Sequence, residues 1–122
     1  MKTLAIIFSL LSVSVYAQTD STVVKVKPEQ AKERIGKITT VCGRVSCITY
    51  TSLQFNPVYL NFSKDYPNQP FAAVISREDF QRINPDPFKI VTSRQVCVTG
   101  LVEDYKGKPQ IVVKDSGLLE IQ

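Results

Sequence analysis

Apolar residues alternate with polar ones over several short stretches of the chain, which is the period of half-buried β-strands. The pattern is clearest in Arg94–Val113, where two alternating runs flank the turn-forming residues Tyr105–Lys108. These runs predict strands over about Gln95–Glu103 and Pro109–Lys114. The chain therefore contains at least one β-hairpin near its C-terminal end.

Three further strands are predicted earlier in the chain, at residues 38–48, 58–63 and 71–75. Gly43 lies within the first of them, where we expect the strand to bulge or bend. The alternation places these side chains on the core side of the three strands: Val41, Val45, Val58, Leu60, Phe62, Phe71, Ala73 and Ile75.

Two short helices interrupt this pattern. One is predicted to begin at Pro28, which suits a first helical position, and to stop at Gly36. The other is predicted at Arg77–Ile83, with Ser76 as its N-cap. Residues Leu118–Ile121 are predicted to add a short edge strand or to pack against the barrel.

The order of these elements is strand, strand, strand, helix, strand, strand. We therefore predict an all-β protein, a small β-barrel with short helices, in which a five-stranded Greek-key OB-fold carries a helix between strands three and four. An immunoglobulin-type sandwich needs about seven strands and no helix at this point. An SH3-like barrel lacks the helix.

The N-terminal residues have the pattern of a secretory signal peptide. Lys2 precedes the apolar run Leu4–Val15, and Ala17 ends a short segment that suits signal-peptidase cleavage. The apolar run is shorter than the roughly 20 residues that span a bilayer, which argues against a membrane anchor. We therefore predict a secreted or periplasmic protein that has no membrane contact once the signal peptide is removed.

This interpretation divides the chain into a signal peptide at 1–17, a flexible lead-in or loosely attached strand at 18–27, and an OB-fold domain at 28–122. Removal of residues 1–17 takes away Lys2 and leaves 14 basic residues against 11 acidic ones. A dedicated duplex-binding protein usually carries a denser stripe of lysine and arginine. The charge thus permits an anionic ligand without requiring one.

The three cysteines suggest one disulfide, because adjacent-strand cysteines oxidise in exported proteins. In strands one and four, the side chains of Cys42 and Cys97 point to the face opposite the core valines. These two strands are neighbours in an OB barrel. Parity thus favours Cys42–Cys97 over the two alternative pairings. Cys47 is then interpreted as a small buried hydrophobe. The chain has no histidine and no zinc-type cysteine spacing, so we predict no metal and no cofactor.

Three segments carry a family resemblance: VCGRV at 41–45, VYLNFSKDYPNQPFAAVI at 58–75, and VCVTGLVEDYKGKPQIVV at 96–113. They resemble small exported bacterial OB-fold domains, similar to the accessory OB modules of secreted sugar-non-specific endonucleases. Stand-alone exported proteins of this kind are usually described as nucleic-acid-binding. The resemblance covers most of residues 28–121 and implies the fold more directly than the activity.

Catalytic chemistry is not apparent in the chain. The absence of histidine removes the usual serine- and cysteine-based triads. Carboxylates are scattered, and no paired set of acids and arginines stands out on strands one to three, as a nuclease built on this barrel would need. We therefore predict that the protein is not an enzyme.

Binding is the favoured function, and the expected ligand is single-stranded DNA or RNA. OB-folds take ligands on the face of strands two and three, framed by two loops. Single-strand binding needs aromatic platforms for bases and cations for phosphates. The alternative is an oligosaccharide- or peptide-binding or protein-docking module, because outward Ala72 and Val74 also suit an apolar contact. The candidate ligand-binding residues are Arg44, Tyr50, Phe55, Tyr59, Asn61, Tyr105, Lys106 and Lys108.

Overall fold

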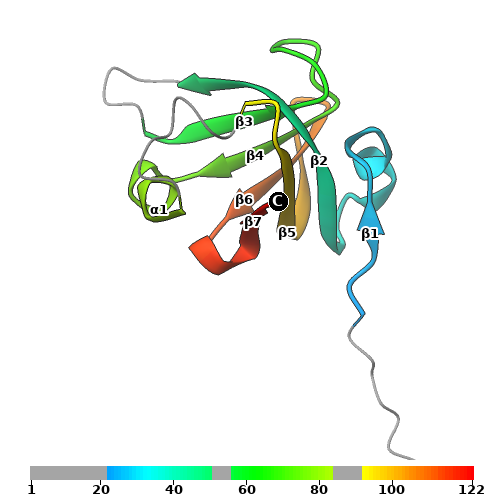
Figure 1. Cartoon of the computed structure of the whole chain (residues 1–122). Coiled ribbons are helices and arrows are strands. Elements are labelled where there is room, and N and C mark those ends of the chain that lie inside the picture. Colours follow the sequence, from blue (N-terminus) through cyan, green and yellow to red (C-terminus); the bar gives the residue numbers. More distant parts are fainter. Residues whose placement is uncertain (1–21, 51–55, 84–91) are drawn as a thin grey trace, which may run out of the picture.

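The computed structural model describes residues 22–50, 56–83 and 92–122, which form a barrel with short helices at its ends (Figure 1). In chain order, the elements are β1 (Lys25–Val26), the 3₁₀ helix η1 (Pro28–Arg34), β2 (Ile38–Tyr50), β3 (Val58–Phe62), β4 (Phe71–Ile75), α1 (Arg77–Ile83), β5 (Gln95–Tyr105), β6 (Lys108–Val113), the 3₁₀ helix η2 (Ser116–Leu118) and β7 (Leu119–Ile121).

Five of these strands close into a ring. The strand order is β1-β2-β3-β4-β6-β5-β7, and an additional pairing of β2 with β5 closes the barrel. Within the ring, β4 and β6 run parallel, whereas the other neighbours are antiparallel. Helix α1 connects the third and fourth ring strands. The predicted five-stranded Greek-key OB-fold is therefore confirmed, helix included.

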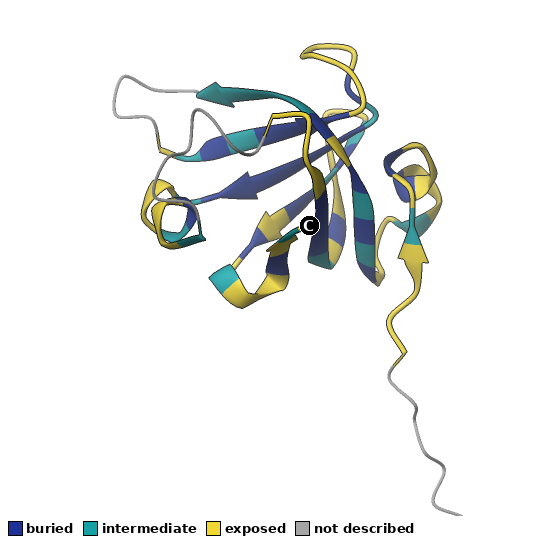
Figure 2. Cartoon of the chain, viewed as in Figure 1, coloured by how far each residue is buried: buried dark blue, intermediate teal, exposed yellow. Residues whose placement is uncertain are grey.

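The inward side chains of all five ring strands form the core of the barrel. Figure 2 shows the buried residues of these strands in dark blue. Val96 and Val98 are fully buried, as their alternation predicts. The rings of Phe62 and Phe71 meet edge to face, with centroids 5.1 Å apart, a favoured aromatic arrangement. Phe80 of α1 joins this core and leaves only 1% of its surface exposed. The helix thus closes one end of the barrel.

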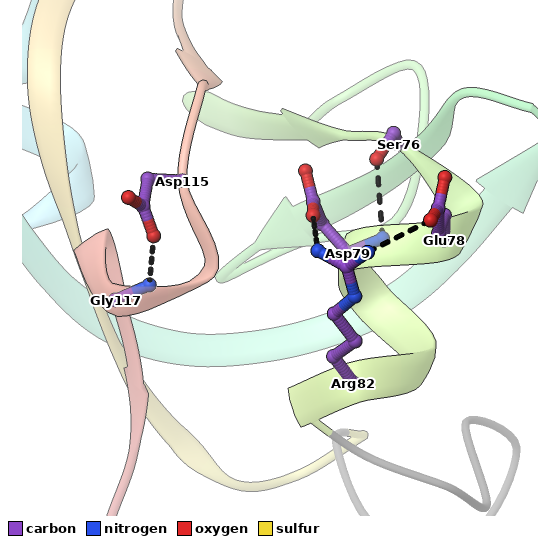
Figure 3. A network of polar contacts seen from close by, with 6 residues as sticks. All are labelled: Ser76, Glu78, Asp79, Arg82, Asp115 and Gly117. Atoms are coloured by element: carbon purple, nitrogen blue, oxygen red, sulfur yellow. Dashed lines mark hydrogen bonds and ion pairs between the residues drawn. The ribbon is translucent and has the colours of Figure 1, made fainter.

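Helix α1 begins with the predicted cap. The backbone N–H of Asp79 donates to Ser76 Oγ at 3.1 Å (Figure 3). Arg82 forms ion pairs with Glu78 at 2.8 Å and with Asp79 at 3.3 Å on the exposed face of the helix. Such solvent-exposed pairs add little stability. The helix is held mainly by its cap and by the burial of Phe80.

The first ring strand begins with an exposed isoleucine and a buried threonine. Ile38 is 55% exposed, and Thr39 takes the inward position instead. Burial of the Thr39 hydroxyl is tolerated because it accepts from Arg34 Nε at 3.1 Å and donates to the carbonyl of Lys37 at 3.1 Å. A register shift of this strand lies between Val45 and Cys47, near Gly43, where a bulge or bend was predicted.

Gly43 is required by close packing. A Cβ atom at this position would lie 2.3 Å from Pro28 Cγ and 2.7 Å from Pro28 Cδ. Pro28 is the first residue of η1 and is itself buried. The glycine therefore allows η1 to lie directly on β2.

The predicted disulfide is present at the seam between β2 and β5. Cys42 and Cys97 are directly opposed in the antiparallel register, with Cα atoms 4.0 Å apart, and their sulfurs are bonded. Cys47 is a free cysteine. It is half-buried rather than buried, and its Sγ accepts from Asn61 Nδ2 at 3.4 Å. The interpretation of Cys47 as a buried hydrophobe was thus too simple.

Two short strands flank this seam. β1 pairs in parallel with β2, so Lys25 and Val26 form a strand within the segment predicted as lead-in. β7 pairs with β5 as the predicted edge strand. The predicted signal peptide and the first part of the lead-in fall in residues 1–21, outside the described residues. In the described part of the chain, no helix has the length and apolar character needed to cross a bilayer.

Candidate ligand-binding site

A cavity of about 630 Å³ lies on the outer face of the barrel, between the β3–β4 loop and the β5–β6 hairpin. Its size falls within the range of about 300–1,000 Å³ that is typical of small-ligand sites. β2, β3, β4 and β6 all contribute to its wall. Its aromatic and cationic lining residues are Tyr50, Tyr59, Tyr66, Tyr105, Lys106 and Lys108.

The pairing of the strands places the residues that form the floor of the cavity next to one another. Asn61 of β3 lies opposite Ala72 of β4, which in turn lies beside Gln110 of β6. Tyr59 lies opposite Thr49 of β2. Because side chains alternate between the two faces of a strand, these positions share the outer face. The parity prediction for Tyr59 and Asn61 therefore holds.

Outward orientation does not mean exposure at the centre of this face. Asn61 is only 1% exposed, and Ala72 and Val74 are 6% and 7% exposed. The Asn61 amide donates to Thr49 Oγ1 at 3.2 Å, in addition to its contact with Cys47. Ala72 and Val74, predicted to face outward and to suit an apolar contact, therefore leave little of their surface exposed.

The β3–β4 loop forms one side of the cavity and was not among the predicted site residues. It contributes Tyr66, which is 65% exposed, and Gln69, which is 7% exposed. The segment 64–70 has the composition of a turn, and nothing in its local pattern indicates that it lies against the strand face. The one signal was the tyrosine itself, an aromatic residue among polar turn formers.

Lys108 holds this loop in place. Its Nζ donates to the carbonyl of Pro67 and, at 3.1 Å, to the carbonyl of Gln69. The ammonium group is thus used to join β6 to the β3–β4 loop. Lys108 lines the cavity as predicted, but it positions the loop instead of presenting a free cation.

The β5–β6 hairpin supplies the opposite rim. Lys106 and Gly107 both have positive φ angles, 51° and 86°, and form the two-residue turn between Tyr105 and Lys108. Positive φ at both positions matches the twist of a hairpin. Lys106 Nζ lies 5.3 Å from the centre of the Tyr105 ring, and that ring is 52% exposed. The hairpin therefore offers a cation and an aromatic face side by side.

The described residues of the lining include no carboxylate that would repel an anion. Among the described residues that line the cavity, none is aspartate or glutamate. Burial raises the pKa of the Tyr50 hydroxyl, although the nearby charge of Arg77 acts in the opposite direction. Tyr50 therefore stays protonated at neutral pH. Nowhere in residues 22–50, 56–83 and 92–122 do three or more acidic, cysteine or histidine side chains gather as a metal site.

The structure brings together six of the eight predicted residues: Tyr50, Tyr59, Asn61, Tyr105, Lys106 and Lys108. Arg44 is not among the lining residues, and its guanidinium donates to Ser93 Oγ at 3.3 Å near the start of β5. Phe55 lies outside the described residues. Among the lining residues that the sequence analysis missed are Tyr66 and Gln69.

The closed ring, the position of α1 and the cavity on the β2–β3 side define an OB-fold protein with a formed pocket on the usual ligand face of that fold. No protein-family model matches the chain, and no curated protein matches it. The fold is nevertheless shared with solved structures.

One similar structure is a protein assigned as an aspartyl-tRNA synthetase from Leishmania major Friedlin. It has a TM-score of 0.54 and 14% identity, and the match covers 88% of this chain and 22% of that one. A second is the Stn1–Ten1 complex of S. pombe, with a TM-score of 0.49, 13% identity and coverage of 70% and 57%. A third is the hypothetical protein ygiW from E. coli, with a TM-score of 0.46, 19% identity and coverage of 83% and 90%. The chain thus spans about a fifth of the first structure and somewhat more than half of the second.

Proposed function

We propose that this protein is an exported, non-enzymatic OB-fold protein that binds single-stranded nucleic acid in the cavity between the β3–β4 loop and the β5–β6 hairpin. The observation that carries the proposal is the gathering of four tyrosines and Lys106 on one face. Aromatic rings that stack on bases, with cations for the phosphates, are the usual means of single-strand binding. The resemblance to exported OB modules supports the same assignment.

Two features support export and a non-enzymatic role. The bond between Cys42 and Cys97 fits an oxidising compartment, because such bonds are rare in cytosolic proteins. The described lining of the cavity offers neither a carboxylate nor a histidine that could move a proton at neutral pH. Binding is therefore the function that these side chains can perform.

The exposure of each side chain indicates which part of the ligand it would contact. Tyr105 and Tyr66 are the more exposed rings at the two rims, and Tyr59 lies between them on the strand face. Lys106 projects from the hairpin, where it can meet a phosphate. A short stretch of a single strand would thus contact both rims at once, with its bases toward the tyrosines.

Replacement of Tyr59 by alanine is expected to weaken binding of a labelled single-stranded oligonucleotide by about tenfold, because one stacking platform is lost. The loss should persist at high salt, since stacking is not screened. Fluorescence anisotropy titrations at two salt concentrations measure it. Tyr59→Phe, which keeps the ring, is the matched control and should bind like the wild type. Absence of saturable binding by the wild-type protein at low salt would contradict the proposed function.

The two lysines of the hairpin are expected to behave differently. Lys106→Ala should reduce the slope of log affinity against log salt by about 0.7, the value for loss of one single-strand phosphate contact. Lys108→Met should weaken binding about fivefold at all salt concentrations, because the β3–β4 loop is no longer held in its binding position. Loss of one hydrogen bond typically costs about 1 kcal/mol. Its slope should stay unchanged, because its ammonium contacts backbone carbonyls. Equal slopes for the two variants would contradict this division of roles.

One observation favours a second candidate ligand, a neutral oligosaccharide. Lys108 is engaged with the β3–β4 loop, and the cavity is lined by the neutral amides of Asn61 and Gln69. Aromatic rings with neutral amides also suit sugars. Such a ligand would bind with an affinity indifferent to salt, whereas a nucleic acid would bind less tightly as salt rises.

A further inference from the structure

Gln69 carries a buried hydrogen-bond acceptor without a partner. The residue is 7% exposed, lines the cavity, and its Oε1 makes no hydrogen bond within the described part of the chain. It is the single buried side-chain atom of this kind among the described residues. A buried polar group left unpaired destabilises a protein, so native structures keep few of them. A ligand that donates a hydrogen bond would remove the penalty.

The position of Gln69 is fixed by its own backbone. Lys108 Nζ donates to the Gln69 carbonyl at 3.1 Å and also to the carbonyl of Pro67. The loop is thereby fastened to β6, and the side chain stays at the cavity wall. The last torsion of a glutamine is broad and roughly two-fold, so rotation of the terminal amide can turn Oε1 toward the cavity without movement of the backbone.

The neighbouring amide is already satisfied on its donor side. Asn61 Nδ2 donates to Thr49 Oγ1 at 3.2 Å and to Cys47 Sγ at 3.4 Å. Asn61 is therefore held within the floor by β2. Gln69 is left as the buried amide that still requires a donor.

We propose that Gln69 accepts a hydrogen bond from a ring N–H or amino group of one nucleobase that enters the cavity, so that the base and not the phosphate occupies it. This inference rests on the proposed function. A phosphate diester offers only acceptors and cannot pair with Oε1. A base offers an N–H donor on its edge and a flat face for the tyrosine rings.

The test compares two oligonucleotides that differ in a single donor. One is a short oligothymidine, whose bases carry the N3–H group. The other is the same oligomer methylated at N3 of every base, which keeps the charge and the ring but lacks the donor. The wild-type protein should bind the unmethylated oligomer roughly tenfold more tightly, as expected for a buried acceptor that gains or lacks its partner.

The variant Gln69→Met has nearly the same shape without the acceptor. It should bind both oligomers equally, and the free variant should unfold at a higher urea concentration than the wild type because the unpaired buried atom is gone. Gln110→Met is the matched control, since Gln110 also lines the cavity but is only half-buried. It should preserve the tenfold preference.

Each outcome is decisive. Equal binding of the two oligomers by the wild-type protein overturns the inference and leaves the proposed function standing. A preference that persists in Gln69→Met shows steric exclusion of the methyl group and also overturns it. If neither oligomer binds, the proposed function fails and the inference fails with it. If a neutral chito-oligosaccharide binds in a manner that depends on Gln69, the occupant is a sugar and the base is excluded.

Discussion

Simultaneous replacement of Cys42 and Cys97 by alanine is expected to lower the free energy of unfolding by about 4 kcal/mol in the chain-entropy model of disulfide stabilisation. The bond joins residues separated by 55 positions. It therefore restricts the unfolded chain over about half of its length. In the folded protein it crosses the pairing of β2 with β5, which closes the ring.

Urea unfolding of the oxidised protein, the reduced protein and the double variant measures this effect. The reduced protein and the variant should unfold at similar, much lower urea concentrations. Cys47→Ala is the control, because Cys47 forms no disulfide and should change stability far less. An unchanged midpoint for the double variant would show that the strand pairing alone holds the seam closed.

The second large effect is expected for Gly43→Ala, which should destabilise the protein by about 2–3 kcal/mol through overpacking. The added Cβ would lie 2.3 Å from Pro28 Cγ, well inside van der Waals contact. A proline ring has little freedom to yield. Either η1 must move away from β2, or the strand must shift inward.

A double-mutant cycle with Pro28→Ala isolates this contact, since removal of the ring should relieve most of the effect of Gly43→Ala. Gly117→Ala provides the control. Its Cβ would meet Asp115 Oδ1 at 3.5 Å, an ordinary contact, and its stability should change by less than about 0.5 kcal/mol. Strict additivity of the Gly43 and Pro28 substitutions would refute the packing explanation.

Much of the fold was predictable because it depends on local sequence signals or on which face of a strand each side chain occupies. The alternation at Val96 and Val98 placed β5 correctly, and Ser76 marked the start of α1. Cys42 and Cys97 could be paired because the strand order made their strands neighbours. Thr39 shares the inward parity of Val41 and Val45, and the hydrogen bonds of its hydroxyl make its burial possible.

The site was less predictable because a distant contact completes it. Tyr59 and Tyr105 followed from strand parity and from the hairpin. Gln69 and Tyr66 reach the cavity because Lys108 fastens their loop to β6, and a contact that spans 39 residues from Gln69 leaves no trace in local pattern. Because of the same contact, Lys108 positions the β3–β4 loop instead of presenting a free cation to a ligand.

The tether from Lys108 to the β3–β4 loop also has a kinetic consequence. The backbone around Gln69 is set before a ligand arrives, so little conformational freedom is lost on association. Encounter rates should then be similar for related ligands. Differences among ligands would appear in how long each one stays, and residence time becomes the quantity by which this barrel discriminates.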